Sequence, residues 1–310
     1  MQPTTMSYMG LSNCLRLENQ DSELIVATAI GPRILRFALR AGENALGEFP
    51  DNSIKTALGD WKPYAGHRLW ASPELFPGTY APDNEPVKYE VIEDPQAGTT
   101  IHLRQQVDAA YLGKELAVTL HATQARATIT HTITNCGMMP ISIAPWAITV
   151  FRGGTAVLPR EPYRSHDQCV TIAQPLGLYH FTDLEDPRYT LGKSYLLLRA
   201  DAGMPSPQKI AFRNKRGWGA HVCASSVLIK TFTYIDSAHY PDYGSNTEVF
   251  AAGDFMEIEL LGEQRSLDPG AVTTLIEHWM LFPGLDEQAT RNEDALHAAL
   301  EPLVAAASSR

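Results

Sequence analysis

Polar and apolar residues alternate along much of this chain, and the longest such run is Gln-Ala-Arg-Ala-Thr-Ile-Thr-His-Thr-Ile-Thr-Asn at 124–135. Successive side chains of a β-strand point to opposite faces, so a period of two predicts a strand with one buried and one solvated face. About a dozen segments read as strands, separated by turn signals such as Asp268-Pro269-Gly270. We predict strands at 22–29, 33–39, 87–93, 99–107, 114–122, 124–135, 141–151, 195–200, 208–213, 226–235, 254–261 and 271–281.

The order of these segments predicts an all-β fold. Strand follows strand without βαβ alternation, which favours one large antiparallel β-sandwich. The C-terminal segment differs, because Ala, Leu, Glu and Arg predominate and its first residues are acidic, as suits a helix N-terminus. We predict a short helical cap at 285–306, packed on the sandwich. No Gly/Ser-rich linker divides the chain, so residues 1–310 are expected to form a single domain with its core at about 10–283.

Composition narrows the class of partner. The net charge is −10 and no block of Lys and Arg occurs, which argues against nucleic acid and anionic membranes. The sequence has no apolar run long enough to span a membrane and no signal peptide, so we expect a cytoplasmic protein. The four cysteines are scattered, and no CxxC, HExxH or Walker spacing occurs. We therefore expect no cofactor and, unless distant residues converge, no metal. A small neutral molecule such as a sugar fits best, bound by a monomer or a homodimer.

The first candidate site is Gly66-His67-Arg68-Leu69-Trp70, followed by Glu74. We interpret this Gly/Pro-bounded segment as a loop, and loops often carry binding groups. Arg68 can donate in a fixed fork to sugar hydroxyls, and the face of Trp70 can cover C–H bonds. An imidazole of ordinary pKa titrates near neutral pH, which makes His67 a candidate acid or base. The alternative is a surface pair of Arg68 and Glu74 beside a core tryptophan.

The second candidate is Met256-Glu257-Ile258-Glu259-Leu260-Leu261. In a strand, Glu257 and Glu259 point to one face and the apolar residues point to the other. If that face lines a cleft, burial and like charge raise the pKa of one carboxyl, as a general base or acid requires. The alternative is an ordinary strand with its polar face in water.

The third candidate is the segment from Tyr240 to Asn246, which includes Asp242. Its two tyrosines, Asp and Asn suit sugar hydroxyls, and Lys230 on the preceding predicted strand can add a cation. The same composition is typical of a plain turn, so both interpretations stay open.

Several motifs together resemble the galactose mutarotase-like superfamily, and within it a bacterial branch. The matching pieces are Ile30-Gly31-Pro32-Arg33-Ile34, Gly66-His67-Arg68-Leu69-Trp70, Pro145-Trp146-Ala147-Ile148, Gly153-Gly154, Tyr240-Pro241-Asp242, Glu257-Ile258-Glu259 and Leu267-Asp268-Pro269-Gly270. The resemblance covers roughly residues 10–283 and implies a large β-supersandwich. Members of the superfamily include aldose 1-epimerases.

The resemblance also implies roles for single residues. Arg68 matches the family's sugar-binding arginine, and Glu259 resembles its general base, with Glu257 as the alternative in a register shifted by two. The family's acid histidine follows a Pro-containing central strand, where this chain has Trp146. An indole N–H donates a hydrogen bond but is not an acid at neutral pH. We therefore hypothesise that His67, which stands where the family has Asn, supplies the acid.

The function implied is a carbohydrate-active isomerase of the aldose 1-epimerase type. A base removes the anomeric proton and an acid protonates the ring oxygen, so the sugar opens and recloses without a cofactor. Glu259 and His67 are the expected catalytic residues, and the expected binding residues are Arg68, Trp70, Glu74, Trp146, Asp242 and Glu257. One alternative is a non-catalytic sugar-binding protein, which Trp146 favours. A second is a glycan hydrolase or lyase.

Overall fold

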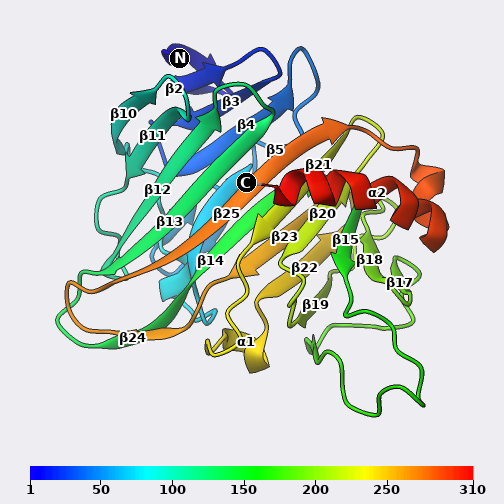
Figure 1. The fold of residues 1–310 in the computed structure, drawn as a ribbon. Coiled ribbons are helices and arrows are strands. Elements are labelled where there is room, and N and C mark those ends of the chain that lie inside the picture. The colour runs from blue at the N-terminus through cyan, green and yellow to red at the C-terminus, as the bar shows by residue number, and fades with distance from the viewer. Residues whose placement is uncertain (310) are drawn as a thin grey trace.

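Two large antiparallel sheets lie face to face in the computed structural model, which describes residues 1–309 apart from the side chain of Glu287 (Figure 1). The first sheet contains, in spatial order, β1 (Thr4–Tyr8), β2 (Leu11–Glu18), β3 (Ser22–Ala27), β4 (Arg33–Leu39), β9 (His67–Ser72), β14 (Ile141–Arg152), β23 (Phe255–Leu261), β22 (Thr247–Ala252), β19 (Gln208–Phe212) and β16 (Leu176–Leu178), and β24 (Arg265–Leu267) pairs with β14.

The second sheet contains β10 (Lys88–Asp94), β11 (Gly98–Arg104), β12 (Leu112–His121), β13 (Arg126–Asn135), β25 (Val272–Pro283), β21 (Ser226–Phe232), β20 (Trp218–Val222), β15 (Thr155–Pro159), β18 (Tyr195–Arg199) and β17 (Tyr189–Leu191). Two small hairpin-like sheets pair β5 (Glu48–Phe49) with β8 (Tyr64–Ala65) and β6 (Ile54–Thr56) with β7 (Gly59–Trp61). The short helices are η1 (Gly78–Tyr80), α1 (Pro241–Gly244) and η2 (Glu287–Arg291). The prediction of a large antiparallel β-sandwich is confirmed.

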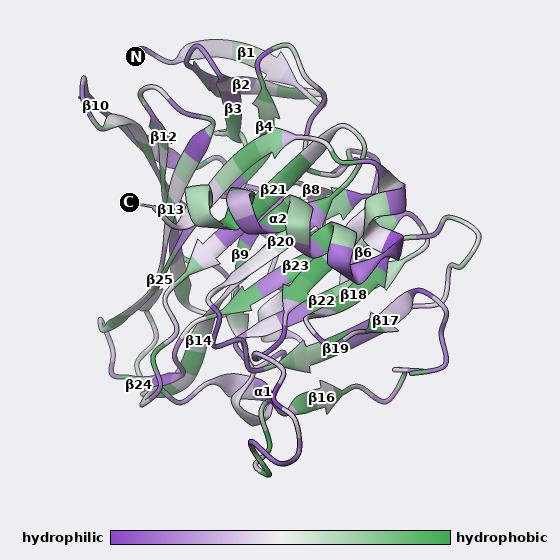
Figure 2. Ribbon diagram, turned by 45° about the vertical axis from the view of Figure 1, so that its right-hand side comes forward, coloured by the Kyte–Doolittle hydropathy of each residue, from purple (hydrophilic) through white to green (hydrophobic). Residues whose placement is uncertain are grey.

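The main hydrophobic core lies between the two sheets. The first sheet contributes residues such as Leu69, Phe151 and Ile258, and the second contributes Ile129 and Trp279. Figure 2 shows this distribution, with hydrophobic colour along the central strands and mostly hydrophilic loops around them. Removing this apolar surface from water is the main force that holds the sheets together.

Strand β13 shows why the Thr/Ile run forms a strand. Its residues Ile129, His131 and Ile133 face the core and are buried, whereas Thr128 and Thr130 on the other face are partly exposed. The side chains thus follow the period of two that the sequence predicts.

The C-terminal helix α2 (Glu293–Ser308) packs on the outer face of the second sheet (Figure 1). Asn292 caps its N-terminus by accepting a hydrogen bond from the backbone N–H of Ala295. Leu296 and Leu300 are fully buried against residues such as Trp218. The helical cap is therefore confirmed, although the helix begins at Glu293 rather than at 285. None of the described helices has both the length and the apolar composition of a membrane span.

One local prediction is wrong. The segment that follows Gly66 is not a loop but strand β9, paired with β4 on one side and β14 on the other, and all six of its residues are buried. This difference decides where the candidate side chains point, because neighbouring residues of a strand lie on opposite faces.

Gly66, which leads into β9, is a position that only glycine fits. Its φ is 68°, and a Cβ there would lie 2.1 Å from the carbonyl oxygen of Ile34. Gly153 has a similar φ of 63°, but a Cβ at that position would meet no atom within 4 Å. We expect Gly66→Ala to lower the free energy of unfolding by about 3 kcal/mol or more, and Gly153→Ala by only about 1 kcal/mol, measured by urea denaturation. Equal losses in the two variants would contradict a specific clash at Gly66.

Candidate functional site

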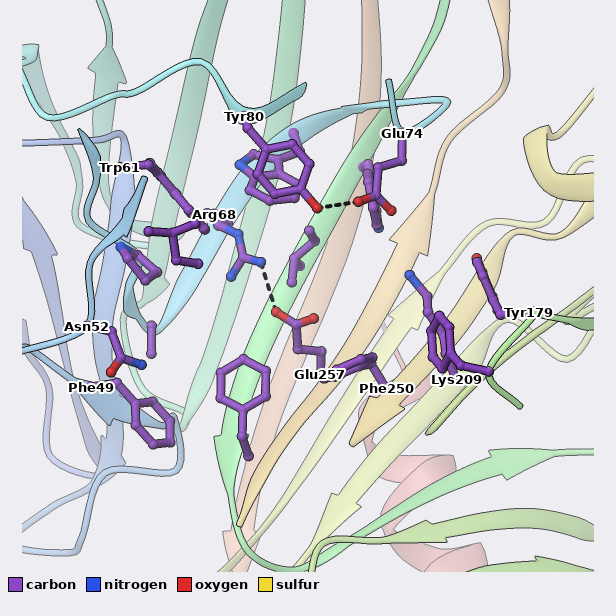
Figure 3. Close-up of a pocket in the computed structure, with 18 of the residues that line it drawn as sticks. Phe49, Asn52, Trp61, Arg68, Glu74, Tyr80, Tyr179, Lys209, Phe250 and Glu257 are labelled. Carbon is purple, nitrogen blue, oxygen red and sulfur yellow. Dashed lines mark hydrogen bonds and ion pairs between the residues drawn. The ribbon is translucent and has the colours of Figure 1, made fainter. Parts of the chain in front are cut away.

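A cleft of about 620 Å³ lies on the face of the first sheet that points away from the core (Figure 3). Its floor is formed by β9, β14 and β23, one wall by the segment around β5–β8, and the other by β19, β22 and residues 179–181. Its lining is rich in aromatic rings: Phe49, Trp61, Trp70, Tyr80, Trp146, Tyr179, Phe181, Phe250 and Phe255. This volume and this lining are typical of a small-molecule site.

An ion pair between Arg68 and Glu257 lies on the cleft floor. Arg68 Nη2 donates to Glu257 Oε1 at 2.8 Å, and both side chains are largely buried (Figure 3). The guanidinium also lies over the rings of Trp70 and Trp61, at 4.6 and 5.2 Å from their centroids. Burial raises the pKa of Glu257, and Arg68 partly offsets this shift. The structure thus brings together residues 189 positions apart in the sequence.

Trp61 is held in the cleft wall by a buried network behind it. Its indole N–H donates to Asp83 Oδ1 at 3.1 Å, and the fully buried Arg33 donates to the same oxygen at 2.6 Å. A charged pair so deeply buried is stable only with its partner in place. Arg33 and Asp83 therefore position the aromatic wall without touching the cleft.

At the rim, Tyr80 and Glu74 form a second polar pair. The Tyr80 hydroxyl donates to the Glu74 carboxylate, which is exposed (Figure 3). The Tyr80 ring packs edge-on against Trp70, with centroids 4.9 Å apart. Burial raises the pKa of Tyr80, so the phenol stays protonated at neutral pH. The predicted residues Trp70 and Glu74 thus both line the cleft.

Glu259 points to the same face of β23 as Glu257 but does not line the cleft, because Trp146 and Lys209 cover it. Its Oε2 accepts hydrogen bonds from Trp146 Nε1 at 2.7 Å and from Lys209 Nζ at 2.9 Å, and the residue is fully buried. Burial raises the pKa of Glu259 to about 7. Lys209 also pairs with Glu248 at 2.8 Å. Of the two predicted glutamates, Glu257 rather than Glu259 reaches the cleft.

Trp146 lines the cleft, and its indole N–H holds Glu259 in place. Lys209 lies against the rings of both Trp146 and Tyr179, at 4.8 and 4.9 Å from their centroids. Tyr179 in turn donates to Glu248 at 2.8 Å. Although burial opposes it, the carboxylates of Glu259 and Glu248 raise the pKa of Lys209 well above its usual value. Lys209 is therefore a fixed cation and not a proton donor at neutral pH.

His67 does not share the cleft with Arg68, which corrects the prediction. As the neighbour of Arg68 in a strand, it points to the other face, into the core between the sheets, and it is fully buried there. It hydrogen-bonds His131 at 2.7 Å and Thr149 at 2.9 Å. Burial lowers the pKa of His67 well below its usual value. A side chain in this position cannot reach a ligand in the cleft.

Two further predicted groups also lie outside the cleft lining. Asp242 belongs to α1, where its φ is 48°, and Lys230 on β21 points into the core, fully buried. In the core, His67, His131 and Glu277 place potential metal-ligating atoms within 4.8 Å of one another.

The sequence analysis missed several cleft residues. Lys209, Tyr179, Trp61 and Phe250 contribute to the cleft or its walls. Lys209 stands in a correctly predicted strand, but no residue near it in the sequence indicates that its side chain meets two carboxylates. The aromatic residues carry no signal either, since each is equally typical of a core position.

No protein-family model and no curated protein sequence matches the chain. Among solved structures, a candidate mutarotase, YeaD, from Salmonella typhimurium matches with a TM-score of 0.57 at 11% identity, over 91% of this chain and 94% of that one. A TPR-domain containing protein from Parabacteroides distasonis matches with a TM-score of 0.57 at 12% identity, over 89% of this chain; the chain spans 48% of that protein. The fold is thus that of the galactose mutarotase-like sandwiches. At such identities the likeness concerns the fold.

Proposed function

We propose that the cleft binds a neutral sugar ring and that the protein is an isomerase of the aldose 1-epimerase type, with Glu257 as the base. The observation that carries this proposal is the Arg68–Glu257 pair on a cleft floor between indole rings. Indole faces suit the C–H surfaces of a pyranose, and a paired guanidinium and carboxylate suit its hydroxyls. The fold shared with a mutarotase-like structure also supports a sugar as the ligand.

The chemistry requires one proton to leave the sugar and another to arrive. Glu257, as a carboxylate, takes the proton of the anomeric hydroxyl, the carbonyl of the open form appears, and the bond from C1 to the ring oxygen breaks. The ring oxygen takes a proton from water, because no imidazole is among the described residues that line the cleft, and the hydroxide left behind regains a proton from the protonated Glu257. Ring closure reverses these steps. A single positioned base typically contributes about 10²–10⁴-fold.

A second candidate, a sugar-binding protein without turnover, is favoured by one observation. The place of the family's acid histidine is taken by Trp146, whose N–H is committed to Glu259. Both candidates share the ligand and differ in whether anomers interconvert. Anomer exchange followed by NMR on a panel of aldoses separates them, because only an isomerase accelerates it. Binding without acceleration would favour the second candidate, and absence of binding would contradict both.

Sugar binding is tested by replacing the guanidinium while keeping its charge. We expect Arg68→Lys to weaken the affinity for a bound aldose about tenfold or more, because an ammonium keeps the pair with Glu257 but loses the fork. Isothermal titration measures the change. The matched control is Arg104→Lys, since Arg104 pairs with Glu115 at 3.0 Å on the exposed surface of the second sheet. An unchanged affinity in Arg68→Lys would place the ligand elsewhere.

A further inference from the structure

A cluster of polar side chains is enclosed in the core between the sheets, on the opposite side of the first sheet from the cleft. His67 comes from β9, His131 from β13 and Glu277 from β25, and all three are fully buried. His67 Nε2 lies 2.7 Å from His131 Nε2 and 3.5 Å from Glu277 Oε1, and His131 Nε2 lies 3.2 Å from Glu277 Oε1. Three potential ligand atoms from both sheets thus converge on one point.

The outer atoms of these side chains are already engaged. His131 Nδ1 lies 3.0 Å from the carbonyl oxygen of Leu275, and His67 Nδ1 lies 2.9 Å from Thr149 Oγ1. Glu277 Oε2 accepts from Trp279 Nε1 at 2.9 Å and from Lys230 Nζ at 3.0 Å. Metal-ligating histidines and carboxylates are oriented by outer partners of this kind.

If both imidazoles are neutral, the inner atoms have fewer hydrogen-bond donors than acceptors. A carbonyl only accepts, so the hydrogen of neutral His131 is on Nδ1 and its Nε2 carries a lone pair. Glu277 Oε1 also only accepts, and it has no hydrogen-bond partner although it is buried. At most one proton, on His67 Nε2, remains for the two other inner atoms, and it points to His131 at 2.7 Å. Without another cation, a carboxylate oxygen stays unsatisfied in a dry core, which is costly.

We propose that His67, His131 and Glu277 bind a divalent first-row transition-metal ion, such as Zn²⁺, that joins the two sheets. Two imidazoles and one carboxylate are a recurrent zinc donor set. Bonds of about 2.1 Å at tetrahedral angles put ligand atoms about 3.4 Å apart. The two distances to Glu277 Oε1, 3.5 and 3.2 Å, fit this value, whereas the two Nε2 atoms, 2.7 Å apart, have to move apart to bind the ion. Lys230 and Trp279 leave Oε1 as the free carboxylate oxygen.

The role of this ion is structural. None of its ligands lines the cleft. Its ligand His67 is the residue before Arg68 on β9. The ion therefore holds, from the core side, the same strand that presents Arg68 to the cleft. The competing arrangement is a metal-free network in which the Lys230 ammonium alone balances Glu277.

The test uses the full chain, unfolded with chelator and refolded with or without Zn²⁺. We expect the wild type to retain roughly one zinc ion per chain after gel filtration, measured by mass spectrometry of the metal, and to melt at a higher temperature than the zinc-free protein. His131→Leu is expected to lose both the ion and the zinc-dependent shift. Thr149→Val, which removes the partner of His67 Nδ1, is expected to weaken zinc binding about 10–100-fold.

The matched control is His221→Leu, because His221 is equally buried in the second sheet but bonds only the backbone of Gly153. It is expected to keep the zinc. X-ray absorption of the zinc-loaded wild type tests the site without any variant, and should show scattering from two imidazoles. A wild type that refolds without bound zinc and melts at the same temperature with and without it would overturn the proposal. So would zinc retained unchanged in His131→Leu, or a spectrum without imidazole scattering.

Discussion

Glu257→Gln is expected to lower the rate of anomer interconversion about 10²–10⁴-fold, while sugar binding is retained within a few-fold. The amide keeps the shape and the hydrogen bond from Arg68 but cannot take a proton. The exchange rate is measured by NMR and the affinity by titration. A loss of binding equal to the loss of rate would show that Glu257 only holds the ligand.

The control for this variant is Glu259→Gln on the same strand. Glu259 is covered by Trp146 and Lys209, and its amide can still accept from both, so the rate is expected to stay within a few-fold of the wild type. A larger loss of rate in Glu259→Gln than in Glu257→Gln would instead identify Glu259 as the base. The pair of variants thus decides between two carboxyls that the sequence alone does not distinguish.

The pH profile gives an independent test of Glu257. As a base it acts only when ionised, and burial raises its pKa above the usual value for glutamate, about 4.3. We expect the rate to fall as the pH drops through this raised pKa and to level off above it. The residual rate of Glu257→Gln is expected to lack that step. An identical step in the variant would assign the titration to another group.

The sandwich was predictable because some long strands, such as β12 and β13, are covered on one face only. The Thr/Ile run of β13 alternates between core and solvent, and such a pattern survives in the sequence without any tertiary information. Strand β9 was not predictable in this way. It is covered by the core on one face and by the cleft wall on the other, so polar and apolar residues do not alternate along it.

The error about β9 explains the error about His67. In a loop, His67 and Arg68 can face the same ligand, whereas in a strand they cannot. Arg68 could be predicted from the residue types around it and from the resemblance to a family, and the shared face of Glu257 and Glu259 from strand periodicity. Features that could not be predicted, such as the meeting of Lys209 with Glu259, depend on sheet order: β19 and β23 are separated in the sheet by β22. Nothing local in the sequence specifies that order.

Lys209→Met is expected to lower the free energy of unfolding by about 3–5 kcal/mol at pH 8, because it leaves two buried carboxyls without their cation. Methionine keeps most of the apolar stem against Trp146 and Tyr179, so the loss reports on the charge more than on packing. Urea denaturation at pH 5 and pH 8 measures it. The exposed Lys215, which pairs with Asp236 and lies over Tyr234, is the matched control, and Lys215→Met is expected to match the wild type.

The sign of the pH effect follows from the carboxyls beneath the cleft. The pKa of Glu259 is raised to about 7, so its contribution to stability is fully present below its unfolded value of about 4.3 and is lost as the pH rises through about 7. Without Lys209, which lowers the pKa values of both Glu248 and Glu259, both carboxyls hold their protons to higher pH. The loss of stability in Lys209→Met is therefore expected to be smaller at pH 5 than at pH 8.

This loss of stability is also expected to shrink when Glu248→Gln and Glu259→Gln are added to Lys209→Met, because the amides need no counter-charge. A penalty that is the same at both pH values and persists in the triple variant would show that Lys209 stabilises the fold through packing alone.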